Sequence, residues 1–240
     1  HTPAGCVRAY LGDLCGGDYD SSVLVCEPVG HLVTRSIVEQ QGVALTARRA
    51  RPQADFLAST DTWFRPSSLA TGPDGALYLA DVYRLYVEHP RFFPEETAKR
   101  LNWRAGDDRG RIWRITPKGT KPRPFAPPET TDDLVALLSD DNGWRRYLGQ
   151  QLLVEQQDQA AIPAIAALLA DNESAVTRLH ALWTLDGLNA LTGDRLERAL
   201  ADPNVFVRRD AVRLAAERLE DQPELIKRLM ELSHDEEVLV

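Results

Sequence analysis

The feature that most constrains the fold is a repeat in the second half of the chain. A short Leu-Ser-Asp, Leu-Ala-Asp or Leu-Ser-His sequence recurs there at steps of 31, 31 and 32 residues. The four copies are Leu138–Asp140, Leu169–Asp171, Leu200–Asp202 and Leu232–His234. A repeat of this length is typical of paired helices, each pair burying its apolar stripe against the neighbouring pairs. It predicts an α-α solenoid over residues 131–240, with about three and a half repeats.

Each copy ends a short amphipathic segment, and a longer helix is expected after each of the first three. Short helices are predicted at Leu134–Leu138, Ile165–Leu169, Leu196–Leu200 and Ile226–Met230, and longer ones open at Trp144, Val176 and Val207. In the third longer helix, Asp202 is the expected N-cap and Pro203 the first helical residue. Arginines recur near these helix starts, at Arg145, Arg178, Arg208 and Arg209. We expect each to pair with an acidic residue of the adjacent repeat, and Trp144, Trp183 and Phe206 to be core residues.

The first half has the short apolar runs and turn residues of β structure. Strands are predicted at residues 23–26, 31–38, 42–47, 76–80 and 111–116, with a tight turn at Pro73-Asp74-Gly75 and a short helix at 94–101. Short strands separated by turn signals indicate a sandwich, barrel or propeller. Five prolines between Pro117 and Pro128 predict an extended linker, assigned to residues 118–130.

Charge is divided unevenly between the two halves. Residues 1–125 carry 17 basic and 14 acidic side chains, whereas residues 126–240 carry 11 and 22, within a net charge of −8. A shift of this size also marks a domain boundary. Phosphate binding needs a basic face, so nucleic acid is not an expected partner. No apolar run is long enough to predict a membrane span.

Three cysteines lie near the start of the chain, at Cys6, Cys15 and Cys26. Their spacings match no zinc pattern, and no Cys-x-x-Cys-His haem attachment sequence occurs. We therefore predict no metal site. Spacing alone leaves two states open, three free thiols or one disulfide with one spare thiol.

Several motifs of the first half follow one another in an order that resembles a known family. They are Val25–Val33 (VCEPVGHLV), Phe64–Pro66 (FRP), Gly72–Arg84 (GPDGALYLADVYR), Glu88–Pro90 (EHP) and Arg109–Arg114 (RGRIWR). Together they are similar to the end of the propeller in planctomycete-type membrane-bound dehydrogenases, which resemble glucose/sorbosone dehydrogenases. Asp202–Arg209 resembles a HEAT repeat.

The resemblance implies an α+β multidomain fold class. Residues 1–117 would form about two blades of a partial β-propeller, and residues 131–240 a solenoid of HEAT-like repeats. The chain would then be a fragment of a longer protein, exported to the periplasm or cell envelope. Its propeller would oxidise a sugar or alcohol with a quinone cofactor, and its HEAT repeats would dock an electron-acceptor domain such as a c-type cytochrome.

On this interpretation most of the cofactor site lies outside the chain, so the fragment itself is expected to be inactive. No cofactor is predicted within these residues. The full-length protein would bind pyrroloquinoline quinone with calcium, and a downstream domain would carry haem c. The alternative is a non-catalytic scaffold that binds carbohydrate or protein, and the presence or absence of those flanking elements separates the two hypotheses.

Within the chain, the resemblance implies a few cofactor-binding candidates. Arg65 precedes a strand expected to be innermost, where a guanidinium can hold quinone carboxylates, or can instead bridge two blades. The other candidates are Asp81, Tyr83, Arg84 and Arg109. A structural role in a turn or between blades is the alternative for Asp81.

His89 is the candidate catalytic base, because Glu88 beside it could set its pKa. Neighbours on an extended chain point in opposite directions, so the two side chains need not meet. For the cysteines, the exported location that the resemblance implies favours a bridge, provided that Cys6 and Cys26 lie on adjacent strands.

Overall fold

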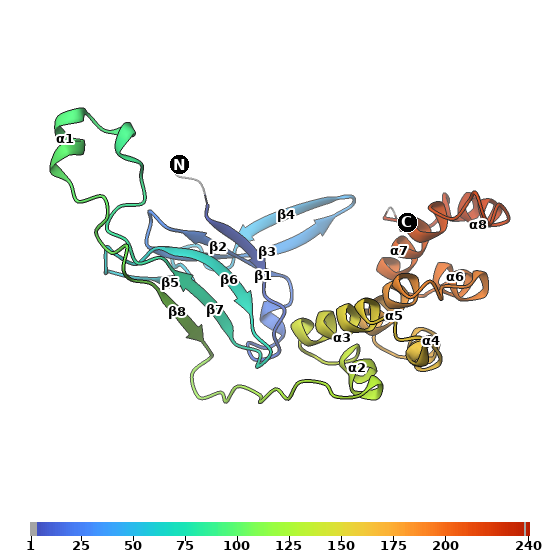
Figure 1. Ribbon diagram of the computed structural model, residues 1–240. Helices are drawn as coiled ribbons and strands as arrows, with labels where there is room; N and C mark the ends of the chain where they lie inside the picture. Colours follow the sequence, from blue (N-terminus) through green and yellow to red (C-terminus); the bar gives the residue numbers. More distant parts are fainter. Residues whose placement is uncertain (1–3, 238) are drawn as a thin grey trace. The chain divides into compact units, whose positions relative to one another are not determined.

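A computed structural model describes residues 4–237 and 239–240 of the chain (Figure 1). The chain divides into two compact units, with the main boundary between Phe125 and Ala126, and the short segment Gly42–Ala44 is grouped with the second unit. The first unit is built mainly of strands and the second of helices. Each has its own cluster of buried apolar side chains, and the two clusters share no residue.

The first unit contains two antiparallel sheets. One has the strand order β1-β2-β3-β4, with β5 also pairing β3, and the other has the order β6-β7-β8. The strands are β1 (Cys6–Ala9), β2 (Ser22–Glu27), β3 (Leu32–Gln41), β4 (Ala44–Arg49), β5 (Leu57–Ala58), β6 (Pro66–Thr71), β7 (Leu77–Asp81) and β8 (Arg111–Ile115). Strands β1 and β2 pack against β6, which brings the two sheets together.

Alternation along the strands builds the core between these sheets. Leu24 and Cys26 of β2 are fully buried, and they pack with Leu69, Leu77 and Leu79 of the other sheet. Side chains two apart on a strand share a face, so β2 and β7 each turn one apolar row inward.

The tight turn predicted before β7 is confirmed. Gly75 has a φ of 82°, and its N–H donates to the carbonyl of Gly72. The carboxylate of Asp74 accepts from the N–H of Ala76, which fixes the chain as it enters β7. Glycine takes this positive φ without the steric cost that a Cβ would bring.

The predicted fold class, a partial β-propeller followed by a HEAT-like solenoid, is wrong. Over the described residues the chain forms two antiparallel sheets with eight strands in all and eight α-helices. Neither sheet closes into a barrel or repeats as a propeller blade. Turn signals and strand lengths are shared by all antiparallel β folds, so they did not distinguish a packed pair of sheets from two blades.

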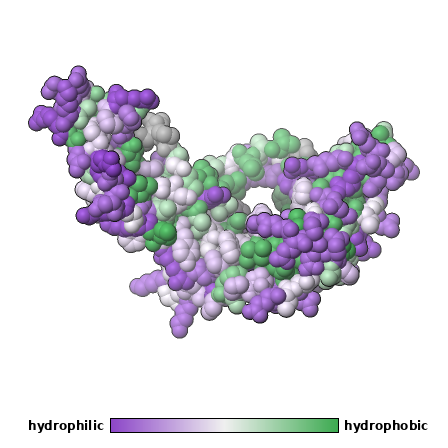
Figure 2. Space-filling model, viewed as in Figure 1, coloured by the Kyte–Doolittle hydropathy of each residue, from purple (hydrophilic) through white to green (hydrophobic). Residues whose placement is uncertain are grey.

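Strand positions were predicted more accurately than their association. The strands β2, β3, β4, β7 and β8 lie where short apolar runs and turn residues predicted them, and β6 begins directly after Arg65, where a further strand was expected. The short strands β1 and β5 were missed, since each is defined by pairing with a longer neighbour rather than by its own pattern. Helix α1 (Glu95–Arg100) forms after Pro94 as predicted and contributes no buried residue. Hydrophilic residues cover its outside in Figure 2.

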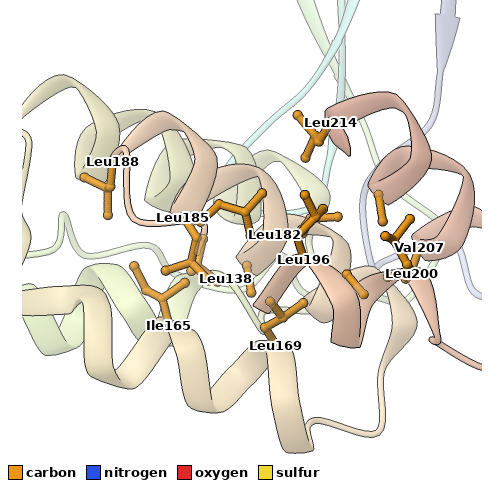
Figure 3. Close-up of a cluster of buried hydrophobic side chains, with 14 of the residues drawn as sticks. Leu138, Ile165, Leu169, Leu182, Leu185, Leu188, Leu196, Leu200, Val207 and Leu214 are labelled. Atoms are coloured by element: carbon orange, nitrogen blue, oxygen red, sulfur yellow. The ribbon is translucent and has the colours of Figure 1, made fainter. Parts of the chain in front are cut away.

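The second unit consists of helices that are alternately short and long. They are α2 (Thr131–Leu137), α3 (Gly143–Glu155), α4 (Ile162–Asp171), α5 (Ala175–Gly187), α6 (Gly193–Leu200), α7 (Val205–Ala216) and α8 (Leu225–Leu232). Helix α2 packs on α3, α4 on α5, and α6 on α7, while α3, α5 and α7 pack on one another in turn. Leucines from successive helices interlock between them, among them Leu138, Leu182 and Leu196 (Figure 3).

Polar side chains cap the three long helices. The side chains of Asn142, Ser174 and Asn204 accept hydrogen bonds from the first-turn N–H groups of α3, α5 and α7. The predicted N-cap at Asp202 is therefore wrong, because α7 begins three residues later. Asp202 instead accepts from the N–H of Asn204 and binds Arg178. Among the described residues, no helix is both long and apolar enough to cross a bilayer.

Candidate functional site

Arg65, the leading cofactor candidate, is bound by backbone carbonyl groups. Its Nε donates to the carbonyl of Arg84 at 2.9 Å, its Nη1 donates to the carbonyl of Pro28 at 3.0 Å, and its Nη2 donates to that of Leu85. The side chain is 93% removed from solvent, and burial lowers its pKa, against which the charge of Glu88 acts. The guanidinium thus joins three segments of its own unit.

Asp81 has a comparable role at the end of β7. Its Oδ1 accepts from the N–H of Arg65 at 2.8 Å and from that of Tyr83 at 2.9 Å, and its Oδ2 accepts from Trp113 Nε1 at 3.1 Å. Tyr83 has a φ of 54°, and its ring lies under the guanidinium of Arg111 at 3.5 Å. A carboxylate that accepts two backbone N–H groups is the usual partner of such a turn.

The remaining candidates contribute less to this cluster. Arg84 joins it through its backbone carbonyl. Arg109 is exposed and lies 3.7 Å from the carboxylate of Asp108. His89 is exposed, and its Nδ1 accepts from the N–H of Arg91 as the cap of a short 3₁₀ helix, Pro90–Phe92. Glu88 accepts from the N–H of Val87, so its carboxylate is turned toward its own backbone.

These contacts favour a structural role for Arg65. Each nitrogen of its guanidinium already donates to a backbone carbonyl oxygen, which holds the group in place. In the part of the chain that the structure describes, no group of three or more His, Cys, Asp or Glu side chains could hold a metal ion. We derive no catalytic step through this cluster.

The helical unit has a groove lined by residues of three helices. It has a volume of about 450 Å³ and is lined by Tyr147 and Gln150 of α3, Leu179, His180 and Trp183 of α5, and Arg209 and Asp210 of α7. Residues three or four apart on a helix share a face, so each helix presents a short row to the groove. Tyr147 is 57% exposed.

The polar groups of the groove are paired with one another. His180 Nδ1 lies 2.7 Å from Gln150 Oε1, and Trp183 Nε1 donates to Asp210 Oδ2 at 2.9 Å. Arg209 Nε donates to the other oxygen of Asp210, also at 2.9 Å. The ring of Tyr147 meets that of His180 edge to face, with centroids 5.0 Å apart. These contacts fix the side chains before any ligand arrives.

Electrostatics keep His180 neutral. Burial, and secondarily the charge of Arg146, lowers the pKa of its imidazole from an ordinary value of 6.5 to about 4. Two cations lie at the rim instead. Arg209 is partly exposed, and Arg213 is exposed with its guanidinium 5.7 Å from the ring centre of Trp183. The groove therefore combines an aromatic lining with a cationic rim.

Ion pairs also link successive helix pairs of this unit. Arg178 holds both carboxylate oxygens of Asp202, and Arg208 holds both of Asp235. The predicted pairing between adjacent repeats is confirmed for these two arginines. Arg145 instead pairs with Asp140 of its own repeat, and Arg209 pairs with its neighbour Asp210.

Arg146 is the equivalent residue of the first pair. Its Nη1 donates to the carbonyl groups of Asp140 and Asp141, as Arg178 and Arg208 do to theirs. Its Nε, however, is buried and has no hydrogen-bond partner among the residues that the structure describes. Asn172 lies two residues before the N-cap of α5, just as Asp202 lies two residues before the N-cap of α7 and there binds Arg178. Unlike a carboxylate, the amide of Asn172 has only one acceptor oxygen. That oxygen accepts from the N–H of Ser174.

Sequence reasoning did not identify the groove. Trp183, expected in the core, is half-buried at the groove, and Phe206 is 42% exposed. The sequence did contain a signal of this groove. Aligning the repeats on Arg146, Arg178 and Arg208 puts His180 and Asp210 at one position, facing α3 and α5 respectively. The first repeat has Leu148 at this position, so the two polar residues that replace an apolar one are the signal.

The chain is thus an α+β protein with a sheet unit and a helical unit. Its residues 1–119 match the model of a family described as a domain of unknown function, DUF7133. The match includes all eight strands and helix α1, and it ends before α2. No curated protein matches the chain. No solved structure matches it either.

Proposed function

We propose that the chain is a protein-binding module, and that the helical unit takes an apolar side chain of a partner into the groove of α3, α5 and α7. The observation that carries the proposal is the exposed ring of Tyr147, which lines the same groove as Trp183, where His180, Trp183, Arg209 and Asp210 are already hydrogen-bonded. Aromatic residues in preformed pockets are the usual anchors of protein interfaces.

The rim favours a partner segment that carries a carboxylate next to its apolar side chain. Arg209 and Arg213 are the charged groups exposed at the groove, and a carboxylate can form charge-assisted hydrogen bonds with either. Residues 126–240 are acidic in total, which by itself would favour a basic partner. Charges beyond about 8 Å are largely screened at physiological salt, so the local cations dominate at this groove.

Selection of peptides from a random displayed library against the whole chain tests this function. Selected peptides should share a large apolar residue flanked by Asp or Glu. Tyr147→Ala should weaken their binding about tenfold or more, as removal of an interface anchor does. Met230→Ala is the matched control, since Met230 is 67% exposed on α8, outside the groove, and its loss should leave affinity unchanged. Equal binding by both variants would refute the proposal.

The oxidation of a sugar or alcohol implied by the resemblance stays a prediction for a longer protein, as do the exported location, the quinone with calcium and the cytochrome partner. The contacts of Arg65 and Asp81 favour structural roles for both residues. The binding function is therefore preferred for this chain. Dye-linked oxidation by the 240 residues alone would reverse that preference.

A further inference from the structure

Two of the three cysteines are direct partners across a strand pair. Cys6 of β1 lies opposite Cys26 of β2 in the antiparallel register. Side chains of directly opposed residues point to the same face, with Cα atoms about 4.5–5.5 Å apart. Disulfides span Cα separations of about 4.4–6.8 Å, so this pair can be bridged without moving the backbone.

The surroundings also bring the two thiols together. Cys26 is fully buried, and the half-buried Cys6 packs against the same core cluster. Burial, followed by the charge of Cys6 and a hydrogen bond with it, raises the pKa of the Cys26 thiol to about 12. The three cysteines are free thiols in this structure.

Cys15 lies in a different environment. It follows β1 in the loop before β2, where its N–H donates to the hydroxyl of Tyr10 at 3.2 Å. That hydroxyl also donates to the carbonyl of Gly75, which holds the loop against the turn before β7. Cys15 is therefore the natural spare thiol of the three.

We propose that Cys6 and Cys26 form a disulfide that fastens the edge strand β1 to β2, while Cys15 remains a thiol. Strand β1 is at the end of the sheet order and has only four residues, three of them exposed. A bridge that closes the intervening loop stabilises the folded state by restricting the unfolded chain.

The oxidant required is a low-molecular-weight disulfide such as oxidised glutathione. The Cys6 thiolate, which is the more accessible, attacks one sulfur of that disulfide and displaces the first glutathione thiolate. The Cys26 thiolate then attacks Sγ of Cys6, forming the Cys6–Cys26 bond and displacing the second. Two protein thiols are oxidised, the added disulfide is reduced, and the two protons pass to the departing thiolates.

Intact mass measured after oxidation and maleimide labelling of the whole chain tests the assignment. We expect one maleimide adduct, a mass about 2 Da below that of the correspondingly labelled thiol form, and a digest in which the Cys6 and Cys26 peptides are linked. Cys15→Ser should form the same bridge with no adduct, and Cys6→Ser should form none. Three adducts after oxidation, or a bridge that includes Cys15, would overturn the proposal.

Hydrogen exchange provides a second readout that does not depend on labelling. Oxidation should slow amide exchange in β1 about tenfold, because opening of the edge strand is then restricted. The same oxidant should leave exchange in Cys6→Ser unchanged. Equal exchange in oxidised and reduced wild-type protein would show that the bridge, if formed, does not fasten the strand.

Discussion

At the scale of single residues, the helical unit depends on where carboxylates meet arginines. Asp202 and Asp235 each receive a guanidinium from the preceding helix pair, whereas Asn172 is the residue at the corresponding position after Arg146. Removing one member of a buried polar pair leaves the other unsatisfied, which costs more than the net contribution of the pair. The Arg146 Nε is such an unsatisfied group among the described residues.

We predict that Asn172→Asp stabilises the protein by about 1 kcal/mol, since the new carboxylate can accept from Arg146 Nε and still accept from Ser174 N–H. Asp202 performs the same two tasks for Arg178 and Asn204. Urea unfolding measures the change. Asn172→Ala, which removes the acceptor for Ser174, should be destabilising, and a destabilised Asn172→Asp would contradict the interpretation.

His180 makes stability depend on pH. Its folded-state pKa of about 4 lies below the ordinary 6.5, so the unfolded chain binds more protons between these values. Stability is therefore complete above the unfolded pKa and decreases as the pH falls toward 4, by about 3 kcal/mol in all. Carboxylates titrate in the same range, so the comparison is with His180→Gln. The free energy of unfolding is measured against pH for the wild-type protein and for His180→Gln. The difference between the two curves should show this loss, and parallel curves would contradict it.

At the scale of elements, helix spacing is set by small residues at contacts. A Cβ built on Gly149 of α3 would lie 2.7 Å from the carbonyl oxygen of Leu134 and 2.8 Å from the Cβ of Leu137. Glycine weakens a helix by about 1 kcal/mol relative to alanine, so its presence here reflects the close approach of α2 and α3.

Gly149→Ala should therefore destabilise the protein by about 1–3 kcal/mol, despite the better helix propensity of alanine, because backbone atoms must move apart. Gly193→Ala at the start of α6 is the matched control. Its nearest neighbour is a side-chain oxygen of Gln222 at 3.6 Å, so that substitution should be neutral or slightly stabilising. Thermal unfolding of both variants distinguishes packing from propensity, and similar shifts would count against the packing argument.

At the scale of the whole molecule, the two hydrophobic clusters lie in separate parts of the chain. One contains residues between Cys6 and Ile115, and the other contains residues from Leu134 onward. Each unit buries its apolar side chains against its own elements, which is the condition for independent folding.

We predict that residues 126–240 fold alone, with a helical circular dichroism spectrum and a cooperative thermal transition. The variant Leu182→Ala in the same piece should lower that transition strongly, because Leu182 is fully buried in the helical cluster. A piece that is unfolded by itself, or that melts without cooperativity, would show that the sheet unit is needed for the helices to fold.

The sequence by itself determined the local elements of this protein. The repeat at about 31 residues located the helix pairs, and short apolar runs with turn residues located β2, β3 and β7, because such patterns are properties of one element. It also predicted that arginines would bind acidic residues of the next helix pair, which holds for Arg178 and Arg208.

Only the tertiary structure decided how the strands associate and what the candidate residues do. Arg65 binds carbonyl groups 19 to 37 residues away, and the carboxylate of Asp81 accepts from the indole N–H of Trp113, 32 residues further along the chain. The groove likewise needs three helices at once. Such contacts depend on the register and packing of distant segments, which no local period encodes, so a propeller was predicted where two packed sheets form.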